Sequence, residues 1–255
     1  MDILLKIGIG SLVGTLIGMT GLGGGVLLLP VLIFGLSVPP ILAVGSDAAF
    51  NFITKIGSGW MHLKSGTVRR SIVVALAIGS VPGSILGVTY LGHLRHVYGD
   101  GVNKFITLAV GVMLVAIPIM LFFQSKIEEH VSNRPPTLKS LAGMWVIGLG
   151  AGFLVGMTSV GSGSIVMMLL LLFYSYPPKV MVGTDIVHAV ALTGVTTLMH
   201  MRMGNVDMRL VLPLLVGSIP GGLFGSYLST RVPVPWLRRM VCALLMATGV
   251  RMLWG

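Results

Sequence analysis

Charged residues are scarce in this chain of 255 residues. They make up 9% of it, with seven Asp and Glu against seventeen Lys and Arg, while hydrophobic residues make up 55%. A soluble domain carries about 25% charged residues, so this chain has too few to cover a water-facing surface. The scarcity excludes a soluble globular protein and indicates a polytopic membrane protein whose solvent is the lipid bilayer.

Other absences narrow the function classes further. The only cysteine is Cys242, which excludes a disulfide framework. No G-x-x-x-x-G-K-[ST] motif occurs, so the chain has no nucleotide-binding loop with which to use ATP. The basic residues lie between apolar runs instead of forming one patch, which argues against a nucleic-acid partner. No cluster of metal ligands stands out, so we expect neither a cofactor nor an enzyme.

Eight apolar segments fill most of the chain and predict an all-α fold. They lie at about 7–36, 40–62, 71–92, 101–123, 141–174, 178–200, 209–229 and 235–254. The first and the fifth are near 30 residues long, although about 20 residues suffice to span a bilayer. A polar stretch at 124–139 separates the first four segments from the last four.

The two sets of four segments are copies of one another. At an offset of 138 positions, "GMT" at 18–20 pairs with "GMT" at 156–158, "GSD" at 45–47 with "GTD" at 183–185, and "MHLKSGTV" at 61–68 with "MHMRMGNV" at 199–206. Duplicated halves are characteristic of secondary transporters. The sequence therefore predicts a first transmembrane repeat at 1–123, a linker at 124–139 and a second repeat at 140–255.

Each half opens with a glycine-broken helix, and the break bears on the topology. If the first segment crosses the membrane once, each half has four crossings and the repeats are parallel. If it enters and turns back at its glycines, each half has three full crossings and the repeats are inverted. The Lys and Arg residues of the loops are equally biased under both arrangements. We favour the re-entrant, inverted arrangement because a hairpin that does not span explains glycines in the middle of a segment.

The glycine breaks are candidate anion sites. Irregular backbone within a bilayer is tolerated where it is buried in protein or lines a cavity, and successive N–H groups beside a helix N-terminus bind anions. Glycines can also serve only to let helices pack closely. The candidate substrate-binding residues at the two breaks are Thr20, Gly21, Gly23, Gly24, Gly25, Thr158, Ser159, Gly161, Ser162 and Gly163.

The second segment of each half carries polar residues at helical spacing. Asp47, Asn51 and Lys55 follow each other every four positions and so share one face. We expect Asn51 and Lys55 to contact the substrate, since ionisable groups within a span are functional candidates. Asp47, Asp185 and His188 are candidates for proton coupling or gating. The alternative is structural: both Asp residues follow a Pro-Pro turn and could cap a backbone segment, and the histidine could bond a neighbouring carbonyl.

These motifs together resemble the sulfite exporter TauE/SafE family of membrane permeases. The resemblance rests on "GLGGGVLLLP", "GSDAAFNFITKIGSGWMHLKSGTV", "GTDIVHA" and "MHMRMGNVD", and it covers nearly the whole chain. It implies transport of sulfur-containing anions such as sulfite and sulfonates, commonly outward, with the loops at 21–25 and 159–163 facing the substrate. Ser159 and Ser162 stand where the first half has Gly21 and Gly24, so the halves need not contribute equally.

The leading hypothesis is a secondary transporter, an exporter of small sulfur-containing anions, that works by alternating access around a central site. The expected partners are that anion and the bilayer of the cell's inner membrane, where the chain would be a multi-pass protein; a homodimer is left open. One alternative is a permease for metal cations, which predicts a site rich in carboxylates or in Met and Cys. Another is an intramembrane serine protease, with Ser162 as nucleophile and His188 or His200 as base.

Overall fold

The computed structural model describes residues 2–20, 24–127, 138–173, 176–229, 231 and 234–254, and all regular structure in them is helical. The predicted all-α fold is confirmed. The elements are α1 (Ile3–Thr20), α2 (Gly24–Pro30), a π-helical turn η1 (Val31–Gly35), α3 (Pro40–Lys64), α4 (Arg70–Tyr98), a 3-10 turn η2 (Gly99–Gly101), α5 (Val102–Ile127), α6 (Leu138–Thr158), α7 (Ser164–Phe173), α8 (Pro178–Arg202), α9 (Met208–Ser229) and α10 (Val234–Trp254). Four stretches in the described ranges are long and apolar enough to cross a membrane: Ile3–Thr20, Arg70–Phe122, Lys179–Arg202 and Met208–Leu228.

Local signals in the sequence set the ends of α3 and α8. Helix α3 begins at Pro40 and α8 at Pro178, each the second residue of a Pro-Pro pair. At the first position of a helix the backbone N–H has no acceptor within the helix, so the N–H that proline lacks costs no hydrogen bond there. Each is followed by a glycine with positive φ, Gly66 (φ +67°) or Gly204 (φ +68°). Left-handed glycine is a common helix terminator, so the two phrases that end in "SGTV" and "MGNV" are stop signals.

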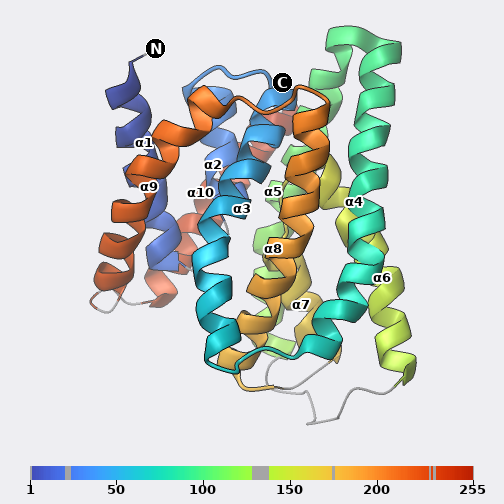
Figure 1. The fold of residues 1–255 in the computed structure, drawn as a ribbon. Coiled ribbons are helices and arrows are strands. Elements are labelled where there is room, and N and C mark those ends of the chain that lie inside the picture. Colours follow the sequence, from blue (N-terminus) through green and yellow to red (C-terminus); the bar gives the residue numbers. More distant parts are fainter. Residues whose placement is uncertain are drawn as a thin grey trace.

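The first segment of each half is divided, as predicted. α1 ends at Thr20 and α2 begins at Gly24, while α6 ends at Thr158 and α7 begins at Ser164. In Figure 1, α1 starts at the top of the molecule and α2 leads back to the top, where the chain enters α3. The α6–α7 pair starts at the bottom and returns to the bottom, where α8 begins. Each pair therefore enters and leaves at one end of the bundle.

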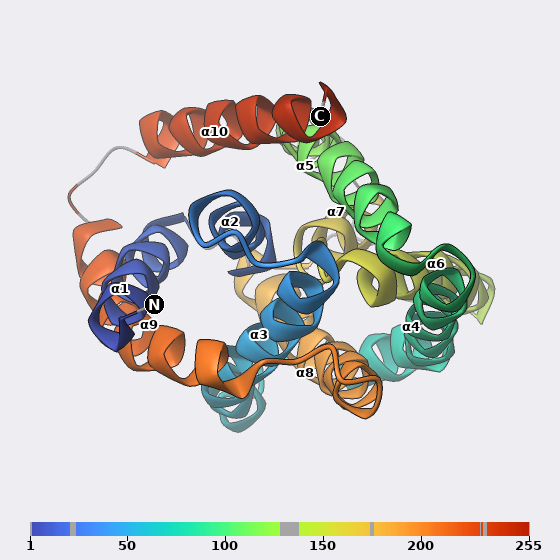
Figure 2. The same cartoon turned by 90° about the horizontal axis from the view of Figure 1, so that it is seen from above.

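The helices form a ring around the two short helices. Seen from above in Figure 2, α1 packs with α9 on one side, α4 with α6 on the opposite side, α5 with α10 along the third and α3 with α8 along the fourth. Helices α2 and α7 lie inside this ring. In Figure 1, α3 runs downward and α8 upward, so the two helices that carry the polar motifs are antiparallel neighbours.

Glycines bring the backbones of two helix pairs into direct contact. A Cβ atom on Gly14 of α1 would lie 2.4 Å from the Ser218 carbonyl oxygen of α9, and one on Gly152 of α6 would lie 2.0 Å from the Ser80 carbonyl oxygen of α4. The same contact recurs every four residues along both pairs. Small residues at this spacing let membrane helices approach closely, and they fix α1 on α9 and α6 on α4.

Candidate functional site

Helix α3 carries three polar side chains toward the inside of the ring. Asp47 and Asn51 are 0% and 1% exposed, and Lys55 is half-buried. They stand one helical turn apart, so they form a row on a single face of α3, as their spacing predicted. This row meets both helix breaks.

Asn51 binds the first break. Its Oδ1 accepts a hydrogen bond from the Gly25 N–H at 3.2 Å, and its Nδ2 donates to Asp47 Oδ2 at 2.9 Å. A Cβ atom on Gly25 would lie 2.7 Å from Asp47 Oδ2, which explains why only glycine fits there. An N–H group at the start of α2 is thus capped by an amide of the protein itself.

Asp47 links the first break to the second. Ser159 Oγ donates a hydrogen bond of 2.7 Å to Asp47 Oδ2, the same oxygen that accepts from Asn51. A Cβ atom on Gly25 would also lie 2.8 Å from the Ser159 carbonyl oxygen. The two interruptions therefore meet at one place inside the molecule.

The second break has a distorted backbone. Ser159 has φ +57°, which is uncommon for a residue with a side chain, and Gly161 has φ +93°. Thr158 Oγ1 donates to the Leu154 carbonyl at 2.7 Å, and Thr20 at the first break donates to the Leu16 carbonyl at 2.7 Å. Both threonine hydroxyls thus direct their hydrogen toward the preceding turn of their own helix.

Lys55 reaches the second break from the first half. Its Nζ donates to Ser162 Oγ at 3.0 Å and lies 3.9 Å from the position of a Cβ atom on Gly163. Because Ser162 Oγ is the acceptor in this contact, its own hydrogen remains for another acceptor. The Lys55 ammonium also interacts electrostatically with Asp185, Asp47 and His188.

Helix α8 supplies the other ionisable groups. Asp185 and His188 are 7% and 0% exposed and lie three residues apart, on one face. Asp185 Oδ2 lies 3.4 Å from the position of a Cβ atom on Gly163, so this carboxyl group sits over the start of α7. His188 Nε2 is hydrogen-bonded to Ser80 Oγ of α4 at 2.8 Å.

Four buried polar atoms among the described residues have no hydrogen-bond partner: Asp47 Oδ1, Ser164 Oγ, Asp185 Oδ1 and His188 Nδ1. Unpaired buried polar atoms are costly and rare in folded proteins. Three of the four belong to the second half: Ser164 opens α7, and Asp185 and His188 lie on α8. These atoms of the second half can therefore still form hydrogen bonds with a ligand, and the Lys55 ammonium lies beside the same break.

The duplicated G-S/T-D phrases have a structural part as well. A Cβ atom on Gly45 would lie 2.0 Å from the Asn205 carbonyl oxygen, and one on Gly183 would lie 2.5 Å from the Thr67 carbonyl oxygen. The Ser46 hydroxyl accepts from the Asp207 N–H, and the Thr184 hydroxyl accepts from the Arg69 N–H, both at 3.0 Å. The first two residues of each phrase dock the loop that follows the other helix, and the third places a carboxyl group at the breaks.

The structure brings together most of the residues proposed from the sequence. Gly24, Gly25, Asp47 and Asn51 gather at the first break and contact Ser159 of the second. Lys55 joins Ser162 and Gly163, with Asp185 alongside. Gly21 and Gly23 lie outside the described residues.

Two residues near the site were not singled out from the sequence. Ser164 opens α7 with an unpartnered hydroxyl, and Ser80 holds His188 from α4. Ser164 directly follows the glycine phrase, so its place at the site could have been predicted from the sequence. The role of Ser80 could not, because it depends on which helix packs beside α8.

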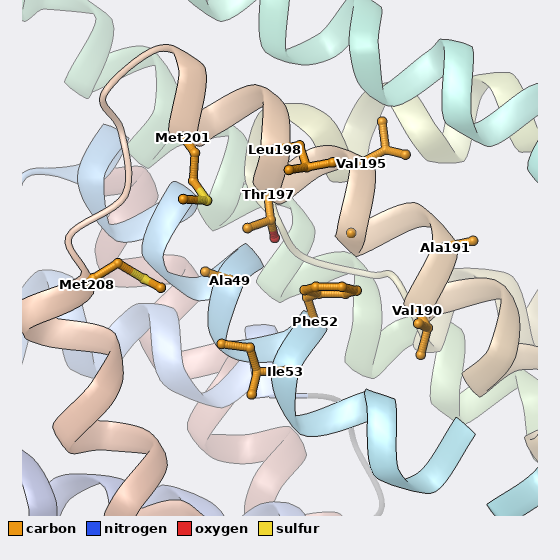
Figure 3. A pocket seen from close by; sticks show the side chains of 11 residues that line it. Ala49, Phe52, Ile53, Val190, Ala191, Val195, Thr197, Leu198, Met201 and Met208 are labelled. Atoms are coloured by element: carbon orange, nitrogen blue, oxygen red, sulfur yellow. The ribbon is translucent and has the colours of Figure 1, made fainter. Parts of the chain in front are cut away.

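A separate groove lies between α3 and α8. It has a volume of about 440 Å³, and apart from Thr197 its lining is apolar, with Phe52, Val190 and Met201 among the lining residues (Figure 3). The Thr197 hydroxyl donates to the Thr193 carbonyl of its own helix. With no charged residue in its lining, this groove is unsuited to an ion.

The contacts also bear on the alternative hypotheses. Among the described residues, no group of three or more His, Cys, Asp and Glu side chains could hold a metal ion. Ser162 is hydrogen-bonded to Lys55, and His188 is hydrogen-bonded to Ser80. His200 Nε2 is hydrogen-bonded to the Gly156 carbonyl at 3.0 Å. In this conformation neither histidine is hydrogen-bonded to Ser162.

Comparison with known proteins gives a consistent result. A family model described as "Sulfite exporter TauE/SafE" matches residues 6–252. The chain is 35% identical over 248 residues to the "Probable membrane transporter protein YjnA" of Bacillus subtilis (strain 168), covering 96% of this chain and 97% of that protein. It is 25% identical over 277 residues to the "Probable membrane transporter protein YunE" of the same organism, covering 100% and 98%. A "Probable membrane transporter protein" of Xylella fastidiosa (strain 9a5c) is 24% identical over 257 residues, covering 99% and 95%. No solved structure matches the chain significantly.

Proposed function

Since the chain belongs to the sulfite exporter TauE/SafE family of membrane transporters and is a multi-pass membrane protein, we propose that it is a secondary transporter that exports small sulfur-containing anions, such as sulfite or organosulfonates. One observation carries the proposal. The Lys55 ammonium is hydrogen-bonded to Ser162 inside a helix break, beside buried polar atoms that have no hydrogen-bond partner. A positive charge at such a depth is costly unless it has an anionic or polar partner.

The substrate oxyanion binds at the second break in this proposal. Lys55 Nζ, the Ser162 hydroxyl, the Ser164 hydroxyl and the Ser164 N–H at the start of α7 are its donors, and the N-terminal end of that helix adds a partial positive charge. Gly163 leaves room for the anion to approach the backbone. The first break, where Asn51 and Asp47 already fill the hydrogen-bonding positions, holds the second break in place through Ser159. Of the remaining proposed residues, Thr20, Gly24 and Gly25 belong to the first break and Thr158 and Gly161 to the second, while Gly21 and Gly23 lie outside the described residues.

A proton accompanies the anion. Two carboxylates against one ammonium would leave the site negative, and a bound anion would add to the excess. Asp185 is the group that we assign to carry the proton, because no hydrogen bond reaches either of its oxygens within the described residues, whereas Asp47 Oδ2 accepts two. Once protonated, its hydroxyl becomes a donor to the anion. Asp47, held by Ser159 and Asn51, is the less mobile carboxylate, with a gating role.

The proposed architecture is an inverted repeat. Three observations support it: α3 and α8 are antiparallel, each broken pair enters and leaves at its own end of the bundle, and the glycine contacts of α1 on α9 recur 138 positions apart in α6 on α4. In transporters built this way the substrate site lies between the repeats, which rock against one another to expose it to either side. When an anion leaves a cell with a negative interior, its free energy falls by about 2.3 kcal/mol per charge per 100 mV, and this fall favours export.

Two alternatives are less well supported. A metal-cation permease would need a cluster of ligands that the described residues do not form. The Lys55–Ser162 contact has the form of a serine–lysine nucleophile pair, but the chain belongs to a transporter family and not to an enzyme family.

A thermal-unfolding series on the purified protein tests the proposal. Sulfite, thiosulfate, sulfoacetate, taurine and sulfate are titrated separately, since a ligand stabilises the folded state in proportion to the logarithm of its concentration over Kd. We expect stabilisation by at least one sulfur oxyanion, its loss in Lys55→Met, and its retention in the control Lys64→Met, which removes an exposed ammonium from the end of the same helix. A flat response to every anion, together with stabilisation by a divalent cation, would overturn the proposal.

A further inference from the structure

His188 has one nitrogen committed and one without a partner. The ring is 0% exposed; Nε2 is 2.8 Å from Ser80 Oγ, and Nδ1 is buried with no hydrogen-bond partner. The ring lies one turn from Asp185 on the same face of α8 and interacts electrostatically with Lys55. His188 is therefore a polar group of the second-half site with unused hydrogen-bonding capacity.

The Ser80 contact bears on which nitrogen carries the proton, because either Ser80 Oγ or His188 Nε2 can be its donor. Ser80 is itself 0% exposed, and its bond to His188 is the one side-chain hydrogen bond that its hydroxyl makes within the described residues. If Nε2–H donated to Ser80, the serine hydrogen would be buried without an acceptor, which is unfavourable. If Ser80 donates to Nε2, the serine hydrogen is satisfied and the neutral imidazole carries its proton on Nδ1, so that one bound acceptor at Nδ1 would satisfy every polar atom of the pair.

We propose that His188 binds the substrate through its Nδ1–H, donating a hydrogen bond to an oxygen of the sulfur oxyanion, and that Ser80 is a positioning residue that holds the ring in this tautomer. This inference rests on the proposed function, because it names a further contact of the same anion. A neutral donor adds a hydrogen bond to the anion without adding charge. His188 then recognises the substrate, and the coupling proton stays with Asp185.

The first half lacks this pair and offers a matched control. The position equivalent to His188 is Phe50, which is 0% exposed, and the position equivalent to Ser80 is Ser218, which packs against Gly14 as Ser80 packs against Gly152. Ser218→Ala thus removes the same hydroxyl at an equivalent place, where no histidine depends on it.

Binding of sulfite to the purified protein tests the contact. We expect His188→Phe and Ser80→Ala to weaken sulfite binding about tenfold or more, as for the loss of a hydrogen bond to a charged group. Ser80→Thr, which keeps the hydroxyl, and Ser218→Ala should bind like the wild type. His188→Asn, which keeps an N–H near the position of Nδ1, should bind better than His188→Phe.

The tautomer is tested separately by ¹⁵N NMR of histidine-labelled protein. We expect the signal that His188→Phe removes to show a protonated Nδ1 in the wild type and to change in Ser80→Ala but not in Ser218→Ala. If sulfite binding needs Lys55 but is unaffected by His188→Phe and Ser80→Ala, the inference is wrong and the proposed function stands. If no sulfur oxyanion binds the wild type, the proposed function fails and this inference with it, whatever tautomer is found.

Discussion

At the scale of single residues, the site is decided by how buried polar atoms are paired. Asp47 Oδ2 and Asn51 are hydrogen-bonded to one another and to both breaks, which leaves Asp47 Oδ1 open, while Asp185, His188 and Ser164 keep atoms without partners around the second break. Asp47 and Asn51 therefore hold the two breaks together, while Asp185, His188 and Ser164 have hydrogen-bonding capacity left for a ligand. The two carboxyl groups, equivalent by sequence, therefore differ in their expected behaviour.

Replacing Asn51 with Leu should destabilise the fold strongly. The change leaves the Gly25 N–H without its acceptor and removes a donor to Asp47, and each unsatisfied buried group costs about 1–3 kcal/mol. We expect a loss of about 2–4 kcal/mol, measured by reversible denaturation in detergent. Thr54→Val on the same helix removes a hydroxyl that only bonds the preceding turn, so its effect should stay below about 1 kcal/mol. Equal losses of stability in the two variants would show that the hydrogen bonds of Asn51 do not hold the two breaks together.

Asp185 should govern the proton that accompanies the anion. We expect wild-type protein to take up about one proton per anion bound, since binding and protonation of one group are linked, and Asp185→Asn to bind without proton uptake because its amide is permanently neutral. A pH indicator in weakly buffered solution measures the uptake during sulfite titration. Asp207→Asn, an exposed carboxylate at the start of α9, serves as the control. Undiminished uptake in Asp185→Asn would assign the proton elsewhere.

Individual residues could be placed on a helix face from the sequence, but their partners could not. Spacing by four predicted that Asp47, Asn51 and Lys55 share one side of α3. That Lys55 meets Ser162, more than 100 positions later, depends on how the two halves dock, and no local pattern encodes it. The hydroxyls of Thr20 and Thr158 were expected to face an anion, whereas their hydrogens bond the preceding turn of the helix.

At the scale of helices, packing depends on glycine stripes. Away from the breaks, the glycines four residues apart in α1, α4, α6 and α9 hold the backbones of neighbouring helices in contact. Their spacing was visible in the sequence as a sign of close helix contact. Which helices would pair could not be predicted, because all four carry such a stripe.

Gly152→Ala and Gly150→Ala on α6 should differ in their effect on the stability of the fold. A Cβ atom at Gly152 would lie 2.0 Å from a backbone oxygen of α4, whereas one at Gly150 would meet nothing within 4 Å. Forcing α4 and α6 apart should cost about 3 kcal/mol or more, and alanine at position 150 should be neutral or stabilise the helix by up to about 1 kcal/mol. Unfolding of both variants in the same detergent measures the difference. Similar stabilities would mean that these helices are not in backbone contact.

At the scale of the whole molecule, the central question is how the halves are related. The boundaries of α3 and α8 could be predicted because Pro-Pro starts and glycine stops are local signals; the duplication of the halves stays a prediction. The direction of the second half could not be predicted from charge. The arrangement seen in Figure 1, with both termini at the top and the start of α6 at the bottom, fits three crossings per half.

Reporter fusions test this topology. Under the inverted arrangement, a reporter after Gly255 and one inserted between 128 and 137 lie on opposite sides of the membrane. With four crossings per half they would lie on the same side. We expect opposite signals from paired reporters, one active in the cytoplasm and one active outside it. Under the inverted arrangement, the excess of Lys and Arg at the linker end predicts that the linker lies inside. Matching signals from the two sites would rule out the inverted repeat.

The most direct measurement is an experimental structure with selenite, the selenium analogue of sulfite, located by its anomalous scattering. We predict one strong peak at the α6–α7 break, with its oxygens within hydrogen-bond distance of Lys55 Nζ and the Ser162 hydroxyl, and no peak in Lys55→Met. A peak elsewhere, such as on the outer loops, would contradict the account. So would an empty break at a selenite concentration that saturates transport.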